Sequence, residues 1–248
     1  MACGWYTSCV ADIVIITPLG HEASALRRVL SRHGLTAHIS GPGPEAIKKA
    51  TLKLIGGAAG EVPRLMILAG LAGGLKPAQT LPRCGWGTTI VDATGNPVRG
   101  RAKSLVGCSW PALRITSIAE PICFPDGKRE LAAATDADYG DTESFWFAQT
   151  CADNDVPWAV IRAVSDDVDE ILPPAVLKWT TPEGKTDPAQ VIKDMIRHPS
   201  LIGKAMRLGS KSKHAMGLIA AELDKVLPHV VGKRAGAGSA GATAGKRP

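Results

Sequence analysis

Residues 157–167 read Pro-Trp-Ala-Val-Ile-Arg-Ala-Val-Ser-Asp-Asp, and this stretch decides the fold. Its apolar run is short and contains valine and isoleucine, which is typical of a strand buried on both faces of a sheet. The run stops at two polar residues, Ser165 and Asp166. In open α/β sheets, ligands bind at the carboxyl ends of the strands. The stretch therefore predicts a buried strand that delivers a carboxylate to a ligand site.

Two other stretches have the same form. Residues 12–17, Asp-Ile-Val-Ile-Ile-Thr, and residues 64–69, Arg-Leu-Met-Ile-Leu-Ala, each predict a buried strand. After the first, the spacing of apolar residues predicts a helix from His21 to about His33. After the second comes Gly70-Leu-Ala-Gly-Gly-Leu75, which predicts a glycine turn followed by a loop.

The rest of the chain alternates in the same way. Helices are predicted over residues 45–55, 126–135, 143–153, 188–197 and 200–227, and strands over residues 88–92 and 113–118. The alternation predicts an α/β fold, a three-layer α/β/α domain with a mixed, largely parallel central sheet. We expect one domain over residues 11–231, with an N-terminal extension at residues 1–10 and a disordered basic tail at residues 232–248.

The charge balance gives little support to a nucleic-acid partner. The formal net charge is 29 − 23 = +6, and the tail supplies four of the basic residues. These are Lys233, Arg234, Lys246 and Arg247. The predicted domain is thus close to neutral, without the basic face that nucleic-acid binding requires. We expect no nucleic-acid partner.

The cysteines and the N-terminal residues bear on the compartment. The six cysteines form no Cys-x-x-Cys pair and have no histidine nearby at metal-ligand spacing, so we expect reduced thiols and no metal site. The first ten residues lack the basic segment of a signal peptide, and the apolar run at residues 13–16 is too short to span a membrane. These features predict a cytoplasmic protein.

Three segments and one further residue bring polar groups to the predicted strand ends. They are residues 17–22, 70–74 and 165–169, together with Glu143 at the start of a helix. Taken alone, each has an ordinary structural explanation. The glutamates would complement helix dipoles, the aspartate would cap a loop or a helix, and the glycines would form tight turns. Only the combination indicates a site.

That combination resembles a known superfamily. Tyr139-Gly-Asp-Thr-Glu-Ser144, a helix, and then Trp158-Ala-Val-Ile-Arg-Ala-Val-Ser-Asp166 resemble the helix start and the Arg-x-x-Ser-Asp strand end of the nucleoside phosphorylases and nucleosidases. Leu19-Gly-His-Glu22 and Ala69-Gly-Leu-Ala-Gly-Gly-Leu75 are similar to the acidic turn and the glycine element of the methylthioadenosine/S-adenosylhomocysteine nucleosidases. The resemblance covers about residues 11–170 and implies a nucleoside phosphorylase-like fold.

The resemblance also implies a reaction. The substrate would be a purine nucleoside-like small molecule, with adenine as the favoured base, cleaved at its N-glycosidic bond without a cofactor. Asp166, oriented by Ser165, would protonate the departing base. Glu143 would accept hydrogen bonds from the ribose and favour the cationic sugar, and Glu22 would activate a water. These roles come from the resemblance and not from the spacing of the residues.

The resemblance also implies a role for the glycine element, and this chain differs from the family pattern at two positions. The backbone around Gly70 to Gly74, with Gly73 among its residues, would lie close against the sugar, where side chains would not fit. Thr142 stands where the family has a methionine under the ribose, and Leu71 replaces a small or hydroxyl residue. A non-catalytic homologue that only binds nucleosides is therefore an alternative to the enzyme.

Water is favoured over phosphate as the nucleophile. The phosphorylases hold phosphate with an arginine just before the glycine element and a hydroxyl within it, where this chain has Leu68 and Leu71. Arg27, Arg28 or an arginine from another subunit could substitute. Phosphorolysis, with phosphate as co-substrate, therefore stays an alternative.

A narrower resemblance suggests a lipid-linked substrate. Residues 125–131, 170–177, 182–184 and 197–199 resemble the hopanoid-associated phosphorylase branch, which is thought to remove adenine from adenosylhopane.

Two expectations concern partners. The superfamily commonly completes its sites across an interface between copies, so we expect a homo-oligomer, with a dimer favoured. Residues 193–213 carry six basic residues beside Leu201, Ile202, Met206 and Leu208. This pattern is either the solvated face of a packed helix or a weak contact with an anionic membrane surface.

Overall fold

The computed structural model describes residues 13–57, 62–100 and 102–231, and places seven strands and seven helices in them. The strands are β1 (Ile13–Thr17), β2 (Ala37–Ile39), β3 (Leu65–Gly74), β4 (Cys84–Val91), β5 (Ala112–Ser117), β6 (Tyr139–Asp141) and β7 (Trp158–Asp166). The helices are α1 (Gly20–Arg32), α2 (Pro44–Ile55), α3 (Pro125–Thr135), α4 (Ser144–Asp153), α5 (Pro174–Leu177), α6 (Pro188–Arg197) and α7 (Ser200–Val230). The extension and the tail expected at the chain ends lie outside the described residues.

The sheet closes on itself. Its strand order is β2-β1-β3-β6-β5-β4-β7, and β7 also pairs with β3. Strands β3, β6, β5, β4 and β7 therefore form a closed barrel, from which β1 and β2 extend. Two pairings, β3 with β6 and β4 with β7, are antiparallel and the other five are parallel. The prediction of a mixed, largely parallel sheet is confirmed, whereas the plain three-layer sandwich is wrong.

The length of β3 explains the closure. Its first residues pair with β1 on one side and β7 on the other, and at Gly73 and Gly74 the strand β6 takes the place of β1. The register with β7 shifts between Ala72 and Gly73, and such a bulge bends the strand. The predicted glycine turn at residues 70–74 is therefore wrong, because these residues form the second half of β3.

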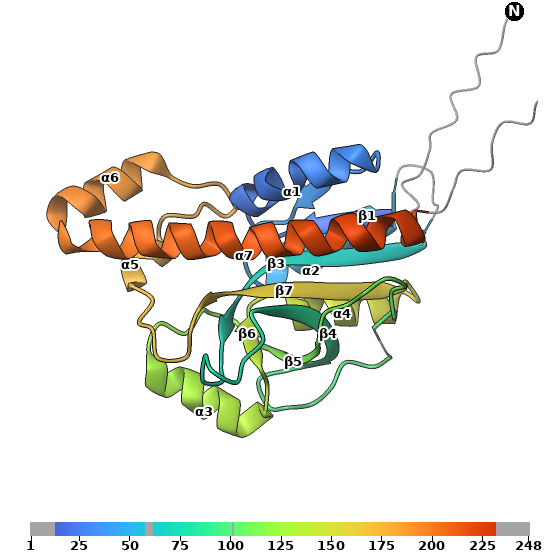
Figure 1. Cartoon of the computed structure of the whole chain (residues 1–248), viewed down its shortest axis with the longest axis horizontal. Helices are drawn as coiled ribbons and strands as arrows, with labels where there is room; N and C mark the ends of the chain where they lie inside the picture. Colours follow the sequence, from blue (N-terminus) through green and yellow to red (C-terminus); the bar gives the residue numbers. More distant parts are fainter. Residues whose placement is uncertain (1–12, 58–61, 101, 232–248) are drawn as a thin grey trace, which may run out of the picture.

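Alternate residues of the central strands face two layers of helices. Ile15 and Ile67 pack with residues of α1 and α7, whereas Ile16 and Leu68 pack with residues of α2 and α4. This alternation follows from the two-residue period of a strand. Figure 1 shows α1 and α7 side by side over the sheet, with α6 and the first turns of α7 projecting beyond it.

The other predicted elements are present, with small shifts at their ends. The sequence did not predict β2, β6 and α5, which are only 3, 3 and 4 residues long. Helix α3 begins at Pro125, with Phe124 in the N-cap position. Among the residues that the structure describes, no helix is both long and apolar enough to cross a membrane.

Candidate active site

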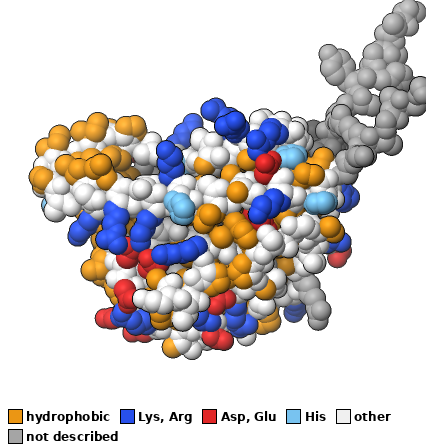
Figure 2. Space-filling model, viewed as in Figure 1, with side chains coloured by type: hydrophobic (Ala, Val, Ile, Leu, Met, Phe, Trp, Pro, Cys, Tyr) orange, Lys and Arg blue, Asp and Glu red, His pale blue; other side chains and the backbone are white. Residues whose placement is uncertain are grey.

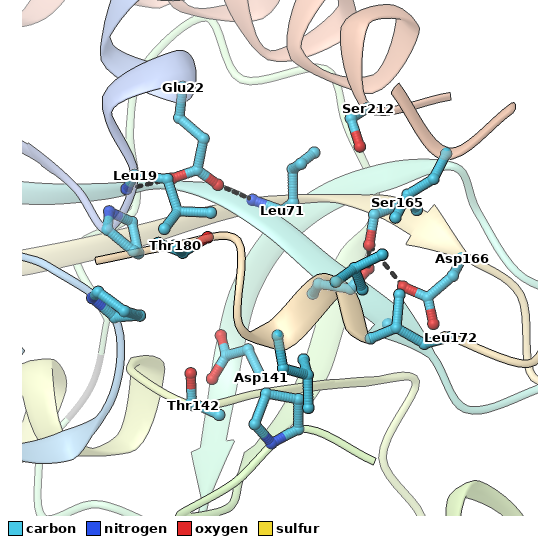
Figure 3. Close-up of a pocket in the computed structure, with 18 of the residues that line it drawn as sticks. Leu19, Glu22, Leu71, Asp141, Thr142, Ser165, Asp166, Leu172, Thr180 and Ser212 are labelled. Carbon is cyan, nitrogen blue, oxygen red and sulfur yellow. Dashed lines mark hydrogen bonds between the residues drawn. The ribbon is translucent and has the colours of Figure 1, made fainter. Parts of the chain in front are cut away.

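A cavity of about 990 Å³ lies where β1, β3, β6 and β7 end. Glu22, Leu71, Gly73, Thr142, Glu143, Ser165 and Asp166 line it, and Gly70 does not. Figure 3 shows Glu22 at one side of the cavity and Asp166 at the other, with Asp141 and Thr142 below Glu22 in the view. The structure thus brings together seven of the eight residues that the sequence indicated.

Glu22 is a buried carboxyl in the first turn of α1, with an exposed fraction of 1%. Its Oε2 accepts a hydrogen bond from the backbone N–H of Leu19 at 2.9 Å, and its Oε1 accepts one from the N–H of Leu71 at 2.8 Å. Burial raises the pKa of Glu22 to about 7, although the Arg162 guanidinium opposes this shift. The side chain helps to close the helix start and is also a carboxyl poised to exchange a proton near neutral pH.

Glu143 occupies the N-cap position of α4 and is also buried. Its Oε1 accepts hydrogen bonds from the N–H of Gly43 at 2.9 Å and from the Thr142 hydroxyl, and its Oε2 lies 3.3 Å from Arg162 Nη2. Burial raises the pKa of Glu143, and Arg162 works in the opposite direction. Thr142 therefore contacts Glu143 directly, which the sequence did not indicate.

Arg162 links the acids under the cavity floor. It is completely buried on β7, and its Nε donates to Asp141 Oδ2 at 2.8 Å. Its Nη1 has no hydrogen-bond partner within the described part of the chain. A Cβ atom at Gly70 would lie 2.6 Å from this nitrogen and 2.7 Å from Glu22 Oε1. Gly70 therefore leaves room for Arg162 and Glu22.

Asp166 ends β7 and is held by two groups. Its Oδ1 lies 2.6 Å from the Ser165 hydroxyl, and its Oδ2 accepts a hydrogen bond of 2.5 Å from Lys128 Nζ. The carboxylates that follow it in the sequence face elsewhere: Asp167 pairs with Arg83 and Lys211, and Asp169 with Arg129. Sequence reasoning missed Lys128, because only the fold brings α3 against the end of β7.

The cavity extends far beyond these polar groups and becomes apolar. Its further lining comes from the segment between β5 and α3, from α3, from the segment around α5 and from α7: Ile118, Ile122, Leu131, Leu172, Val176, Leu177, Trp179, Ala205, Leu208 and Met216. Ser212 of α7 adds a hydroxyl (Figure 3). No arginine is among the described residues that line the cavity.

The segment that follows α5, residues 180–186, packs against the first turn of α1, and we call it the strap. The N–H of Gly20 donates to the carbonyl of Gly184 at 2.7 Å, and Gly184 has φ +75°. A Cβ atom at Gly184 would lie 2.4 Å from the Pro18 carbonyl oxygen. Thr180 and Thr186 at the two ends of this strap line the cavity.

The described cysteines and acids form no metal centre. Cys84, Cys108, Cys123 and Cys151 are free thiols. Within residues 13–57, 62–100 and 102–231, no group of three or more histidine, cysteine, aspartate or glutamate side chains is arranged to hold a metal ion.

The fold is shared with known nucleosidases. Futalosine hydrolase of Helicobacter pylori strain 26695 matches over 88% of this chain and 97% of its own, with a TM-score of 0.62 and 14% identity. The 5'-methylthioadenosine/S-adenosyl homocysteine nucleosidase of Campylobacter jejuni matches over 86% and 97%, with a TM-score of 0.59 and 15% identity. The Helicobacter pylori nucleosidase of the same name matches over 88% and 98%, with a TM-score of 0.61 and 14% identity.

No protein-family model and no curated protein matches the chain. The likeness therefore rests on the path of the backbone, with its closed barrel and the helices around it. It agrees with the resemblance that the sequence motifs indicated. The chain has the fold of these nucleosidases.

Proposed function

We propose that this protein hydrolyses the N-glycosidic bond of a purine nucleoside-like substrate, with adenine as the favoured base. The observation that carries the proposal is the arrangement of three acids around one cavity. Glu22, with a pKa of about 7, lies at one side, Asp166 at the other, and Glu143 lines the cavity as well. An oxocarbenium-like sugar with water on one face and the departing base on the other requires such a set.

Each acid has a chemical task in this proposal. Glu22 accepts a proton from the attacking water, for which a pKa near the working pH is suited. Glu143 accepts hydrogen bonds from ribose hydroxyls and stabilises the positive charge that develops on the sugar. Asp166, in contact with Ser165, faces the five-membered ring of the purine and passes it a proton.

Water is the nucleophile that the cavity supports best. A phosphate dianion needs cationic partners, and the lysines that line the cavity are Lys128, which is already bound to Asp166, and Lys213. Arg27 and Arg28 are exposed on α1 and do not line the cavity. The named neighbours are also hydrolytic enzymes. Phosphorolysis is the second candidate, for which Lys213 or a partner's arginine would hold the anion.

The size of the cavity favours a substrate larger than a simple nucleoside. Its volume of about 990 Å³ is at the upper end of the ~300–1,000 Å³ usual for small-molecule sites. The part away from Glu22 and Asp166 is lined mainly by leucine, valine, isoleucine and methionine, with Ser212 and Lys213 among the polar exceptions. We propose that the sugar carries an apolar substituent there, and an adenosyl lipid of the hopanoid type fits this description.

A direct assay tests the proposed reaction. The protein is incubated with adenosine, methylthioadenosine and inosine, with and without phosphate, and free base is measured. Water labelled with ¹⁸O shows whether the released sugar takes its oxygen from solvent. The Glu22→Gln variant, purified in parallel, measures any contaminating host activity. Release of base with label supports hydrolysis, and release only with phosphate supports phosphorolysis. Tight nucleoside binding without cleavage would leave the non-catalytic alternative.

We also propose that the protein acts in the cytoplasm as a homo-oligomer, with a dimer favoured. The projecting end formed by α6 and the start of α7 is a place for weak contact with an anionic membrane surface. Ile192, Ile196, Ile202 and Met206 are exposed there beside Lys193, Arg197 and Lys204. Figure 2 shows the apolar end with basic side chains next to it.

Two experiments distinguish contact of this end with a membrane from contact between two copies of the chain: sedimentation with vesicles and light scattering. Binding to anionic vesicles that weakens with salt supports the membrane contact, because surface charge attraction is screened. Light scattering on the protein alone, compared with an Ile196→Asp variant, shows whether the same end joins two copies. A dimer that dissociates in the variant, without vesicle binding in the wild type, would assign this end to self-association.

A further inference from the structure

Lys128 is a buried cation at the candidate active site, and no sequence motif indicates it there. Its side chain is 3% exposed, and its Nζ donates to Asp166 Oδ2 at 2.5 Å, to the Asp167 carbonyl at 2.9 Å and to the Glu170 carbonyl at 3.0 Å. All three ammonium hydrogens are thereby used. One of these hydrogens is donated to Asp166, the carboxylate that lines the cavity.

Anchoring of the loop after β7 does not by itself explain a lysine at this position. Lys128 stands near the N-terminal end of α3, where the helix dipole disfavours a cation. A buried ammonium is costly unless it is paired and fully hydrogen-bonded. Its neighbour Arg129 makes the ordinary surface pairs of such a helix, with Asp126 and Asp169. The cation at position 128 is instead directed at the cavity carboxylate.

The contact between Lys128 and Asp166 also bears on the source of the proton in the proposed reaction. This inference rests on the proposed function. A carboxylate that accepts from an ammonium and from the Ser165 hydroxyl has no proton of its own to give. The departing purine nevertheless needs one, because it otherwise leaves as an anion. Two groups donate to Asp166, the Ser165 hydroxyl and the Lys128 ammonium, and an ammonium gives up a proton more readily than an aliphatic hydroxyl.

We propose that Lys128 is a positioning residue that supplies, through Asp166, the proton taken by the departing base. As the bond between the sugar and the purine breaks, its electron pair passes to the purine. The proton of Lys128 Nζ moves to Asp166 Oδ2, and the acid so formed donates it to the five-membered ring of the base. The neutral amine keeps two N–H donors for the carbonyls of Asp167 and Glu170.

The proton count closes over the cycle. The attacking water adds its oxygen to the sugar and gives one proton to Glu22. Glu22 then releases that proton to solvent, and Lys128 recovers one from solvent after the base has left. The net reaction adds one water across the glycosidic bond, with no oxidant, reductant or cofactor.

The test measures how the rate depends on the leaving group. Single-turnover rates are determined for adenine nucleosides with electron-withdrawing groups at C2 or C8, whose bases leave more easily as anions. The variants are Lys128→Met, which removes the charge, and Lys128→Arg, which keeps a cation that holds its protons far more tightly. Arg129→Met, next along the same helix and outside the cavity lining, is the matched control. Thermal unfolding confirms that each variant is folded.

The proposal predicts a change of slope and not only of rate. Lys128→Met and Lys128→Arg should lose roughly 100-fold with the adenine nucleoside, the usual size of a proton-transfer contribution. They should lose much less with the activated bases, so that the rate depends more steeply on the leaving group, while Arg129→Met keeps the wild-type slope. An unchanged slope in both variants, or a wild-type slope restored by arginine, would overturn the proposal. A wild type that cleaves none of these nucleosides would refute the proposed function instead.

Discussion

At the scale of single residues, the ionisation of Glu22 should govern the pH dependence. Burial holds its pKa at about 7, so the side chain is largely protonated below that pH and cannot accept a proton from water. We expect kcat to rise about tenfold per pH unit up to about pH 7 and then to level off. Rates measured from pH 5 to 9 check this. A profile that is flat across pH 7 would exclude Glu22 as the base.

Replacing Glu22 by glutamine should remove this dependence. The amide keeps the volume of the side chain but cannot act as a base, so we expect a loss of at least ~100-fold in kcat. Glu45→Gln on α2 is the matched control, because Glu45 is exposed and pairs only with Lys48 among the described residues. Comparable losses in the two variants would show that the effect is not specific to the cavity.

Gly70 gives a second test at this scale. A methyl group there would meet Arg162 Nη1 at 2.6 Å and Glu22 Oε1 at 2.7 Å, so Gly70→Ala should displace the carboxyl that activates water. We expect a fall in kcat of more than about tenfold, since small misplacements of catalytic groups are costly. Gly203→Ala in α7, with no atom within 4 Å of the added carbon, should leave kcat unchanged and slightly favour the helix.

At the scale of elements, the strap, which consists of residues 180–186, should position one wall of the cavity. Gly184→Ala combines an unfavourable φ of +75° with a Cβ atom 2.4 Å from the Pro18 carbonyl oxygen. Gly34→Ala has a similar φ of +69° but no atom within 4 Å of its Cβ, so it measures the backbone cost alone. We expect KM to rise in Gly184→Ala and not in Gly34→Ala. Equal effects of the two substitutions on KM would mean that the strap does not shape the site.

The elements also show what the sequence could predict. The long helices and the buried strands β1 and β7 were predicted, because their signals are local runs of side chains. The closure of the barrel was not, since it depends on pairings between distant segments, such as Met66 with Trp158 and Cys84 with Ala163. The second half of β3 was predicted as a turn because its glycines favour turns in isolation, whereas pairing with β7 keeps them extended.

The same distinction holds within the site. The sequence motifs predict that Glu22, Glu143 and Asp166 lie at strand ends and helix starts. In the structure all three line one cavity. The contact of Lys128 with Asp166 spans 38 residues of sequence and depends on where α3 packs, so no local pattern contained it. The position of Gly70 beneath the site, facing Arg162, likewise follows from the path of β7.

At the scale of the whole molecule, the apolar part of the cavity predicts a preference for substrates with an apolar chain on the sugar. Burial of each methylene contributes up to about 0.8 kcal/mol, or roughly fourfold in affinity, until the cavity is full. We therefore expect kcat/KM to rise along a series of adenine nucleosides with 5′-alkylthio chains of increasing length. A series without any rise would restrict the substrate to the polar end of the cavity.

A bulky residue placed in the apolar part should cancel this preference selectively. Gly209 lines the cavity on α7 and has no atom within 4 Å of its Cβ position, so Gly209→Trp can fill the space without a backbone clash. Gly203→Trp lies on the same helix, six residues earlier and outside the lining, and is the matched control. We expect the ratio of kcat/KM for long-chain and short-chain substrates to fall toward one in Gly209→Trp and to stay at the wild-type value in Gly203→Trp. If both variants keep the wild-type ratio, the chain does not lie along α7, and the apolar lining there has another occupant.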